Sequence, residues 1–375
     1  MNTPILQFGT SRFLQAHADL FVSEALSRGE ALGRITVVQT TDSPASTARL
    51  AALAEGYEVI VRGLRGGEPV EERQRVTSVQ AALSTARDWP QLRAGFASGT
   101  VQVVLSNTGD AGYQGFDDDS AAQLGAAAAA PRGFPAKLLV LLHERWQRVP
   151  EAPLSLLPCE LISRNGDTLR DIVSQLAQQW QLPTEFQAWL LAHPVWANSL
   201  VDRIVPEALS PAGAVAEPYA LWAIERQPRL VLPCTHPAIV VTDALQEFER
   251  LKLWLLNLGH TLLAELWLRA GQPPGMTVLD AMRDLAWHRV LQGVWQDEVL
   301  PVFDALGEGP AARDYLVELR SRLLNPFVAH RLADIAQNHA VKKQRRLAPV
   351  VAEAQARLPG LAQPWLRAAL HPPTQ

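Results

Sequence analysis

Short apolar runs and helical spacing alternate in the first part of the chain. Pro4–Phe8 and Ile35–Gln39 are apolar runs that predict strands, and Phe13–Leu26 between them has the apolar spacing of a helix. A strand–helix–strand start of this kind has a right-handed crossover. The crossover places the beginning of the helix at the carboxyl edge of a parallel sheet.

The same alternation continues to about residue 243. Further strands are predicted at Tyr57–Arg62, Arg75–Val79, Val101–Ser106 and Leu154–Leu161. Helices are predicted at Ser84–Leu92, Ala136–Trp146 and Thr168–Gln178. The pattern indicates an α/β fold whose N-terminal domain is doubly wound and Rossmann-like.

The rest of the chain has helical spacing and no strand signal of comparable strength. The periodic segments are Phe248–Leu268, Val278–Glu298, Ala311–Leu324, Val328–Gln337 and Pro349–Arg357. We therefore predict a dinucleotide-binding domain over residues 1–243 and an all-helical domain for substrate binding and catalysis over residues 244–375. Since small-molecule sites tend to lie in clefts at domain interfaces, we expect catalytic residues near the start of the helical domain.

Composition narrows the possible partners. The chain has 375 residues, 48% of them apolar, and its net charge of −4 argues against nucleic acid. Its two cysteines form no CxxC pair, so a disulfide framework is not expected. The N-terminus lacks the basic start of a secretory signal, and no apolar run is long enough to span a bilayer. We expect a cytoplasmic protein without a membrane partner, and the oligomeric state stays open.

Lys252, Asn257 and His260 interrupt an apolar helical segment. On an α-helix Asn257 lies about 140° and His260 about 80° round from Lys252, so the three share one side. Desolvation lowers the pKa of a lysine towards neutrality, which suits a general acid or base. The alternative is a lysine that extends its amine to solvent, beside a histidine near a helix end.

The turn Gly9-Thr10-Ser11-Arg12-Phe13 follows the first predicted strand. A dinucleotide fingerprint has glycine at its first, third and sixth positions, and here Ser11 and Leu14 replace the last two. The location still favours cofactor binding, because backbone N–H groups between a strand and a helix can hold a pyrophosphate. We therefore expect this turn to bind a dinucleotide.

Asp42, Asn107 and Thr108 are the other candidates for cofactor contact. Asp42 follows the second strand, where a carboxylate can bind a ribose 2′-hydroxyl and favour NAD over NADP. A loop or helix-capping aspartate is the alternative. Asn107 and Thr108 follow a later strand at the same edge, where a nicotinamide ribose would lie.

Taken together, these segments resemble the polyol-specific long-chain dehydrogenases and reductases, the mannitol dehydrogenase family. The spacing Lys-x4-Asn-x2-His from Lys252 to His260 is similar to the active-site signature of that family. The other matching segments are Gly9–Phe13, Asn107–Gly112, Phe134–Leu138, Cys159–Gly166, Asn198–Ile204, Glu217-Pro218, Asn325–Phe327 and Lys342–Arg346.

The resemblance implies hydride transfer between a secondary alcohol and NAD without a metal ion. Lys252 would take or give the alcohol proton, and Asn257 would stabilise negative charge on the substrate oxygen. His260 would orient Lys252 or hold a substrate hydroxyl. Asp202 and Arg203 would support the substrate cleft, and for a neighbouring acid–base pair in an apolar stretch a structural role is the commoner one.

Two departures from the family pattern bear on the substrate. Leu161 stands where mannitol-type enzymes have an asparagine, and Asn165 is a possible replacement for that donor. The surrounding segment looks more like tagaturonate reductases, which act on keto sugar acids. A substrate carboxylate would suit Lys342 and Arg346, although a solvated surface is the alternative. The chain also looks shorter than typical hexuronate reductases.

Four functional hypotheses remain open from the sequence. The first is a reductase for a tagaturonate- or fructuronate-type sugar acid, and the second is a dehydrogenase for a neutral polyol or a polyol phosphate. The third is a non-catalytic nucleotide-binding relative, which the incomplete glycine pattern would suit. The fourth is metal-assisted catalysis at Asp117–Asp119, where we predict no metal, because consecutive acids in a polar loop are usually solvated.

Overall fold

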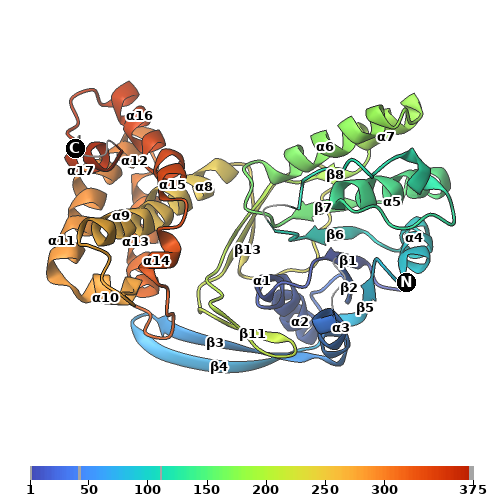
Figure 1. Ribbon diagram of the computed structural model, residues 1–375, viewed down its shortest axis with the longest axis horizontal. Coiled ribbons are helices and arrows are strands. Elements are labelled where there is room, and N and C mark those ends of the chain that lie inside the picture. The colour runs from blue at the N-terminus through green and yellow to red at the C-terminus, as the bar shows by residue number, and fades with distance from the viewer. Residues whose placement is uncertain (1, 41–43, 110–111, 371–375) are drawn as a thin grey trace. The chain divides into compact units, whose positions relative to one another are not determined.

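The computed structural model describes residues 2–40, 44–109 and 112–370 (Figure 1). It consists of two compact units. The first contains Met1–Ile60, Glu72–Ala216 and Ala220–Leu245, and the second contains Val61–Glu71, Glu217–Tyr219 and Gln246–Gln375. In the described part of the chain, no helix is long and apolar enough to cross a membrane.

The main sheet of the first unit has six parallel strands within the described residues, in the order β5-β2-β1-β6-β7-β8. The strands are β1 (Ile5–Phe8), β2 (Ile35–Gln39), β5 (Val79–Ser84), β6 (Val103–Ser106), β7 (Ser155–Pro158) and β8 (Val195–Trp196). This is the strand order of a dinucleotide-binding fold, whose ligand crevice opens where the order reverses, beside β1 and β6. The predicted Rossmann-like domain is confirmed.

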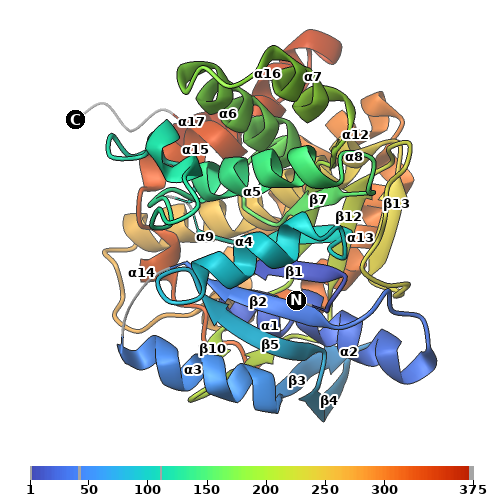
Figure 2. The same cartoon turned by 90° about the vertical axis from the view of Figure 1, so that its right-hand side faces the viewer.

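Helices cover both faces of this sheet, as Figure 2 shows. One face carries α2 (Ala18–Arg28) and α3 (Pro44–Glu55), and the other carries α4 (Trp89–Ala97), α5 (Phe134–Arg148) and α6 (Asn165–Gln179). Strands β1, β2, β6 and β7 are buried along their whole length, because a parallel sheet covered on both sides has no solvent face. The unit also contains α7 (Thr184–Ala192) and the 3₁₀ turn η1 (Ala121–Leu124).

The first predicted helix is broken in the structure. It forms α1 (Arg12–Gln15) and α2, which are separated at Ala16 and His17. The Gln15 side chain donates to the Thr10 carbonyl at 2.9 Å and accepts from the Gly213 amide at 2.6 Å. A buried His17 ring bonded to the Leu221 carbonyl then fixes the break. These contacts come from residues distant in the sequence, so helical spacing alone did not reveal the break.

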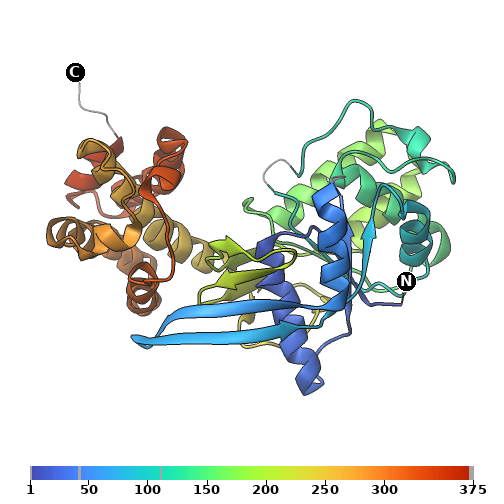
Figure 3. The same ribbon diagram turned by 60° about the horizontal axis from the view of Figure 1, so that its bottom comes forward.

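The predicted strand Tyr57–Arg62 does not belong to the main sheet, and the predicted strand Arg75–Val79 belongs to it only at Val79. Tyr57–Arg65 (β3) and Glu68–Val76 (β4) flank Gly66 and Gly67, and they lie in a separate sheet of order β10-β11-β3-β4 (Figure 3). The predicted strand Arg75–Val79 therefore spans the end of β4 and the start of β5. Two glycines with positive φ between alternating segments are a hairpin signal that the sequence analysis missed.

The sequence analysis also missed the short strands between residues 199 and 242. They are β9 (Ser199–Asp202), β10 (Glu207–Ala208), β11 (Gly213–Ala216), β12 (Leu221–Glu225) and β13 (Ile239–Thr242). Strands β13, β12 and β9 form a further sheet of that order. Helix α4 also begins later than predicted, at Trp89 rather than Ser84, because Ser84 ends β5.

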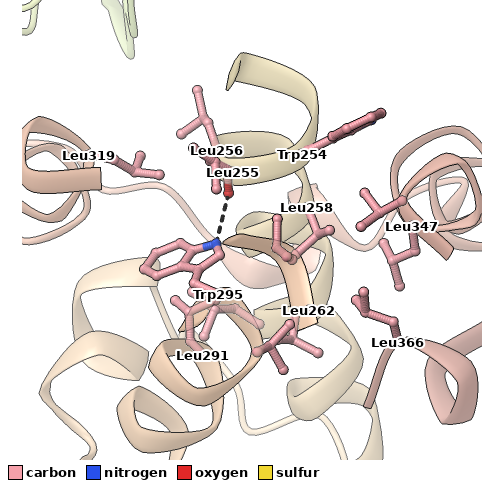
Figure 4. Packing of buried hydrophobic residues seen from close by; sticks show 14 of the residues in the cluster. Trp254, Leu255, Leu256, Leu258, Leu262, Leu291, Trp295, Leu319, Leu347 and Leu366 are labelled. Carbon is pink, nitrogen blue, oxygen red and sulfur yellow. Dashed lines mark hydrogen bonds between the residues drawn. The ribbon is translucent and has the colours of Figure 1, made fainter. Parts of the chain in front are cut away.

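The second unit is helical beyond β13 in its described residues, as predicted. Its helices are α8 (Leu245–Leu251), the π-helical segment η2 (Lys252–Asn257), α9 (Leu258–Arg269), α10 (Val278–Arg283), α11 (Leu285–Gly293), the π-helical segment η3 (Val294–Val299), α12 (Leu300–Leu306), α13 (Gly309–Leu323), α14 (Leu332–Ile335), α15 (His339–Arg346), α16 (Ala348–Arg357) and α17 (Pro364–Leu370). Large apolar side chains from these helices pack into one core (Figure 4).

Three helix predictions in this unit were wrong in detail. Phe248–Leu268 contains a π-helical segment, and Val278–Glu298 is interrupted at Asp284, whose carboxylate caps α11 by accepting from the Ala286 and Trp287 amides. Only Leu332–Ile335 of the predicted Val328–Gln337 is helical. Capping and tertiary contacts override a continuous apolar period in these places.

Candidate active site

The ends of β1, β6 and β7 are linked by side chains of the predicted cofactor site. Gly9 has φ of +114°, and a Cβ atom at this position would lie 2.6 Å from the Asn107 carbonyl oxygen. The Ser11 hydroxyl donates to Asn107 Oδ1 at 3.1 Å, and Asn107 Nδ2 donates to the Cys159 carbonyl at 2.8 Å. The sheet edge thus brings Gly9, Ser11 and Asn107 together where the strand order reverses.

Glu160 organises the loop that follows β6. Its carboxylate accepts hydrogen bonds from the Ser106 hydroxyl at 2.9 Å, from the amide and hydroxyl of Thr108 at 3.0 Å each, and from the Tyr113 hydroxyl at 3.2 Å. Burial, followed by the charge of Glu160, raises the pKa of Tyr113 and keeps it a donor. The sequence analysis assigned Glu160 no role, although its place directly after a strand at the carboxyl edge was a usable signal.

Within the described part of the chain, the other predicted cofactor residues of this turn form no hydrogen bond with Asn107 or Glu160. The Thr10 carbonyl accepts from Gln15, Arg12 is exposed, and the Phe13 ring stacks on His17 at 4.7 Å. Asp42 lies outside the described residues, so its predicted ribose contact stays a prediction.

Asn165 does not replace the donor that is absent at Leu161, which corrects our expectation. Asn165 is fully buried, and its Nδ2 donates to the carbonyls of Pro158, Glu160 and Ser199. Its Oδ1 accepts from the Ser199 amide at 2.9 Å. The side-chain amide is therefore fully used in joining β7 to β9, while Leu161 is 71% exposed.

Asp202 and Arg203 are both buried at the end of β9. The Arg203 guanidinium donates to the Ala16 carbonyl at 2.6 Å, at the break between α1 and α2. A backbone carbonyl at a helix break needs such a donor, because its helical partner is missing. This contact agrees with the structural role that the sequence analysis preferred for this acid–base pair.

Lys252 and Asn257 are the first and last residues of the π-helical segment η2. At the end of the segment, the Leu258 amide bonds to the carbonyl of Leu253, five residues earlier. Because an i→i+5 bond closes about one turn, residues five apart lie nearly above one another in such a segment. Lys252 and Asn257 therefore lie closer to one line than an α-helix would allow. Short π segments recur at functional sites.

Asn257 and His260 contact side chains and backbone groups whose proximity the sequence analysis did not predict. The Thr261 hydroxyl donates to the Asn257 carbonyl at 2.8 Å, and Arg346 donates to Thr261 Oγ1 at 3.1 Å. The His260 ring meets the His330 ring edge-on at 4.8 Å between centroids. Within the described residues, Nε2 of His260 has no hydrogen-bond partner. Burial, and then the nearby cationic groups, lower the pKa of His260 far below its usual range, so the ring is neutral at pH 7.

Two basic side chains of α15 have no carboxylate partner within the described part of the chain. Lys342 Nζ donates to the Ile335 carbonyl at 2.8 Å, and Arg346 bonds only to Thr261 and the Asn257 carbonyl. Burial lowers the pKa of both groups. Neighbouring cations are neutralised, because Lys343 pairs with Glu265 at 3.3 Å and the buried Arg322 pairs with Glu217 at 2.8 Å. The pair Lys342 and Arg346 can therefore hold an anion.

Two of the three acids at Asp117–Asp119 serve the loop before α5. Asp118 pairs with Arg132 at 3.0 Å, and Asp119 accepts from the Arg132 and Gly133 amides at 2.7 and 2.8 Å. Among the described residues there is no group of three or more histidine, cysteine or acidic side chains placed to hold a metal ion.

Comparison with known proteins identifies the family. Residues 3–232 match the mannitol dehydrogenase Rossmann domain, and residues 244–362 match the mannitol dehydrogenase C-terminal domain. The chain belongs to the mannitol dehydrogenase family. The predicted family and the predicted oxidoreductase class are thereby confirmed.

Sequence relatives within the mannitol dehydrogenase family include altronate oxidoreductases from several bacteria. The protein of Halalkalibacterium halodurans is 30% identical over 92% of this chain and 69% of its own length. The protein of Cronobacter sakazakii is 31% identical over 98% of this chain and 78% of its own length.

Two solved structures of dehydrogenases share the fold. D-sorbitol dehydrogenase in substrate-free form superposes with a TM-score of 0.79 at 19% identity, covering 95% of this chain and 77% of that one. Pseudomonas fluorescens mannitol 2-dehydrogenase, in a ternary complex with NAD and D-mannitol, gives 0.75 at 18% identity, covering 99% and 78%. This chain therefore shares its fold with both dehydrogenases.

Proposed function

We propose that this chain is an NAD-dependent oxidoreductase that interconverts a keto sugar acid, of tagaturonate or fructuronate type, and its alcohol. Residues 1–243 are assigned to the cofactor and residues 244–375 to the sugar acid. The assignment agrees with relatives that are altronate oxidoreductases, since altronate is a hydroxylated carboxylate.

The first unit has the features that a dinucleotide needs. The absence of a side chain at Gly9 leaves the end of β1 open to close approach by a ligand, and the strand order creates a crevice beside it. Gly9–Phe13, Asn107 and Thr108 would hold the cofactor, and Glu160 would fix the Thr108 loop. When bound, the cofactor would accept the hydride as NAD⁺ or supply it as NADH.

The pair Lys342 and Arg346 is the observation that carries the choice of a sugar acid. Two half-buried cations without a carboxylate partner in the described chain are costly, unless a ligand supplies the negative charge. A guanidinium binds a carboxylate through parallel hydrogen bonds, which gives both charge and orientation. A neutral polyol would leave this charge uncompensated.

We assign the proton transfer to Lys252. In the oxidation direction the neutral amine of Lys252 takes the proton of the reacting hydroxyl while hydride leaves the same carbon, and the C–O bond becomes a carbonyl. Reduction runs the same steps in reverse. The Asn257 side chain would stabilise the developing negative charge on oxygen. Neutral His260, with its open Nε2, would accept or donate a hydrogen bond to a neighbouring hydroxyl.

A substrate panel tests this function. Altronate and other hexonates, mannitol, sorbitol and their phosphates would be offered with NAD and with NADP, and reduced cofactor would be followed by absorbance. We expect the highest kcat/KM with a hexonate and NAD. Equal or better turnover of neutral polyols would contradict the sugar-acid assignment. Binding of NADH without turnover of any member would contradict the enzymatic assignment.

A further inference from the structure

Trp295 packs against the buried side of the π-helical segment η2. The residue lies in η3, the second π-helical segment, and is fully buried. Its indole Nε1 donates to the carbonyl of Leu255, in the middle of η2, at 3.3 Å (Figure 4). A side chain 40 residues away in sequence is thus bonded to the backbone between Lys252 and Asn257.

The Leu255 carbonyl lies in the segment where the helix type changes. The Leu258 amide is shared between the Leu253 carbonyl, five residues back, and the Leu255 carbonyl, three residues back. A bond over three residues has poorer geometry than an α-helical one, and the indole N–H gives this carbonyl a second donor. A hydrogen bond to a carbonyl in an apolar core stabilises the backbone conformation in which it forms.

Gly259 makes room for the indole. A Cβ atom at Gly259 would lie 2.8 Å from Cζ2 of Trp295 and 3.5 Å from Cδ1 of Leu291. Only a glycine allows the ring to lie this close to the helix at the start of α9. The hydrogen bond and the close packing therefore fix Trp295 at the junction between η2 and α9.

We propose that Trp295 is a positioning residue for the reaction, because its indole holds η2 in the π-helical form that brings Lys252 and Asn257 towards one line. The inference rests on the function proposed for Lys252. If η2 returned to α-helical geometry, Asn257 would turn to about 140° from Lys252, which moves the two groups apart around the helix and misplaces them relative to one substrate oxygen.

Trp295→Phe tests the hydrogen bond, because the change removes the N–H and keeps most of the ring. Trp267→Phe is the matched control: Trp267 lies in the same unit and donates to the Pro273 carbonyl at 2.9 Å, away from η2. We expect kcat to fall by about 10- to 100-fold in Trp295→Phe, the scale of a misplaced catalytic group, with KM for NADH changed by less than about twofold. Trp267→Phe should keep kcat.

A second measurement follows Lys252 without turnover. The chain has only four lysines, Lys137, Lys252, Lys342 and Lys343, so reductive ¹³C-methylation gives few NMR resonances. Lys252→Arg assigns its resonance. We expect this resonance to move in Trp295→Phe and to stay in place in Trp267→Phe. A structural loss of stability without repositioning would affect both variants alike.

The measurements of kcat and of the Lys252 resonance distinguish the proposed function of the protein from the positioning role of Trp295. If the wild-type protein turns over no member of the panel while the Lys252 resonance moves in Trp295→Phe, the proposed function fails and the positioning role stands. If Trp295→Phe matches Trp267→Phe in both kcat and resonance, the positioning role is overturned. Should Trp295→Phe not fold, Gly259→Ala displaces the indole instead and carries the same expectations. Alanine also favours a helix over glycine.

Discussion

The chain contains 34 basic residues, but only four of them are lysines, and Lys252 is one of these. This matters because an arginine keeps its proton at any physiological pH, whereas a desolvated lysine can give up its proton near neutrality. Among the lysines and arginines of this chain, a lysine at the start of η2 is the kind of side chain that can exchange a proton with a sugar hydroxyl.

Replacing Lys252 tests its role directly. Lys252→Ala should lower kcat by about 10²- to 10⁴-fold, the usual share of general acid–base catalysis, and leave NADH affinity unchanged. Lys252→Arg should be nearly as slow, since a guanidinium keeps the charge but does not release its proton. Steady-state kinetics and NADH fluorescence titration measure the two quantities. Near-normal turnover in either variant would show that the proton goes elsewhere.

The predicted carboxylate site gives a second test at the level of single residues. Arg346→Ala and Lys342→Ala should each raise KM for a hexonate by about 10- to 100-fold, because a hydrogen bond to a charged group contributes about 1.5–3 kcal/mol. Lys343→Ala is the matched control on the same helix, since Lys343 is already paired with Glu265. Equal effects of all three changes would mean that only the general positive potential matters.

At the scale of the elements, the turn after β1 is sensitive to one added methyl group. Gly9→Ala would place a Cβ 2.6 Å from the Asn107 carbonyl and at φ of +114°, so the turn and the end of β6 must separate. We expect NADH affinity to fall at least about tenfold.

Gly29→Ala is the control for this change. Gly29 also has a positive φ, +71°, but a Cβ there would meet nothing within 4 Å. This variant should lose about 1 kcal/mol of stability and keep its NADH affinity. Calorimetric titration with NADH distinguishes the two variants, and unchanged affinity in Gly9→Ala would remove the turn from the cofactor site.

At the scale of the whole molecule, a buried carboxyl group makes stability depend on pH. Asp19 on α2 is fully buried and accepts from the Tyr57 hydroxyl at 2.7 Å, while its other oxygen has no partner within the described residues. Burial raises the pKa of Asp19 to about 7, against the opposing effect of the Tyr57 and Gln7 hydrogen bonds. The folded protein therefore keeps this proton at a pH where the unfolded chain has released it.

The difference in Asp19 protonation between the folded and unfolded states determines how stability changes with pH. Between about pH 4 and pH 7 the folded state binds one more proton than the unfolded state, so the free energy of unfolding falls as pH rises, by at most about 1.4 kcal/mol per pH unit. Asp19→Asn removes this dependence. Urea unfolding at pH 5 and pH 7 should show the stability of the wild type, relative to the variant, falling by about 2–3 kcal/mol. Parallel pH profiles would place the titrating group elsewhere.

Part of the fold could be predicted from local patterns of apolar residues in the sequence. The apolar runs of β1, β2 and β6 and the helical character beyond residue 243 could be predicted, because strands buried on both faces and helices with an apolar stripe leave a direct trace in sequence. The broken first helix, the displaced hairpin of β3 and β4, and the full engagement of Asn165 could not. In each case the deciding partner lies far along the chain, as for Gln15 and Gly213.

The sequence alone determined the residue types at the strand ends, the spacing of Lys252, Asn257 and His260, and the cluster of basic residues at Lys342–Arg346, because each is a property of one short segment. Tertiary structure decided the helix type that relates Lys252 to Asn257, since the supporting indole comes from Trp295. It also decided which cations stay without a carboxylate: Glu265 and Glu217 lie 78 and 105 residues from the Lys343 and Arg322 that they neutralise. Only folding brings such charges within hydrogen-bond distance.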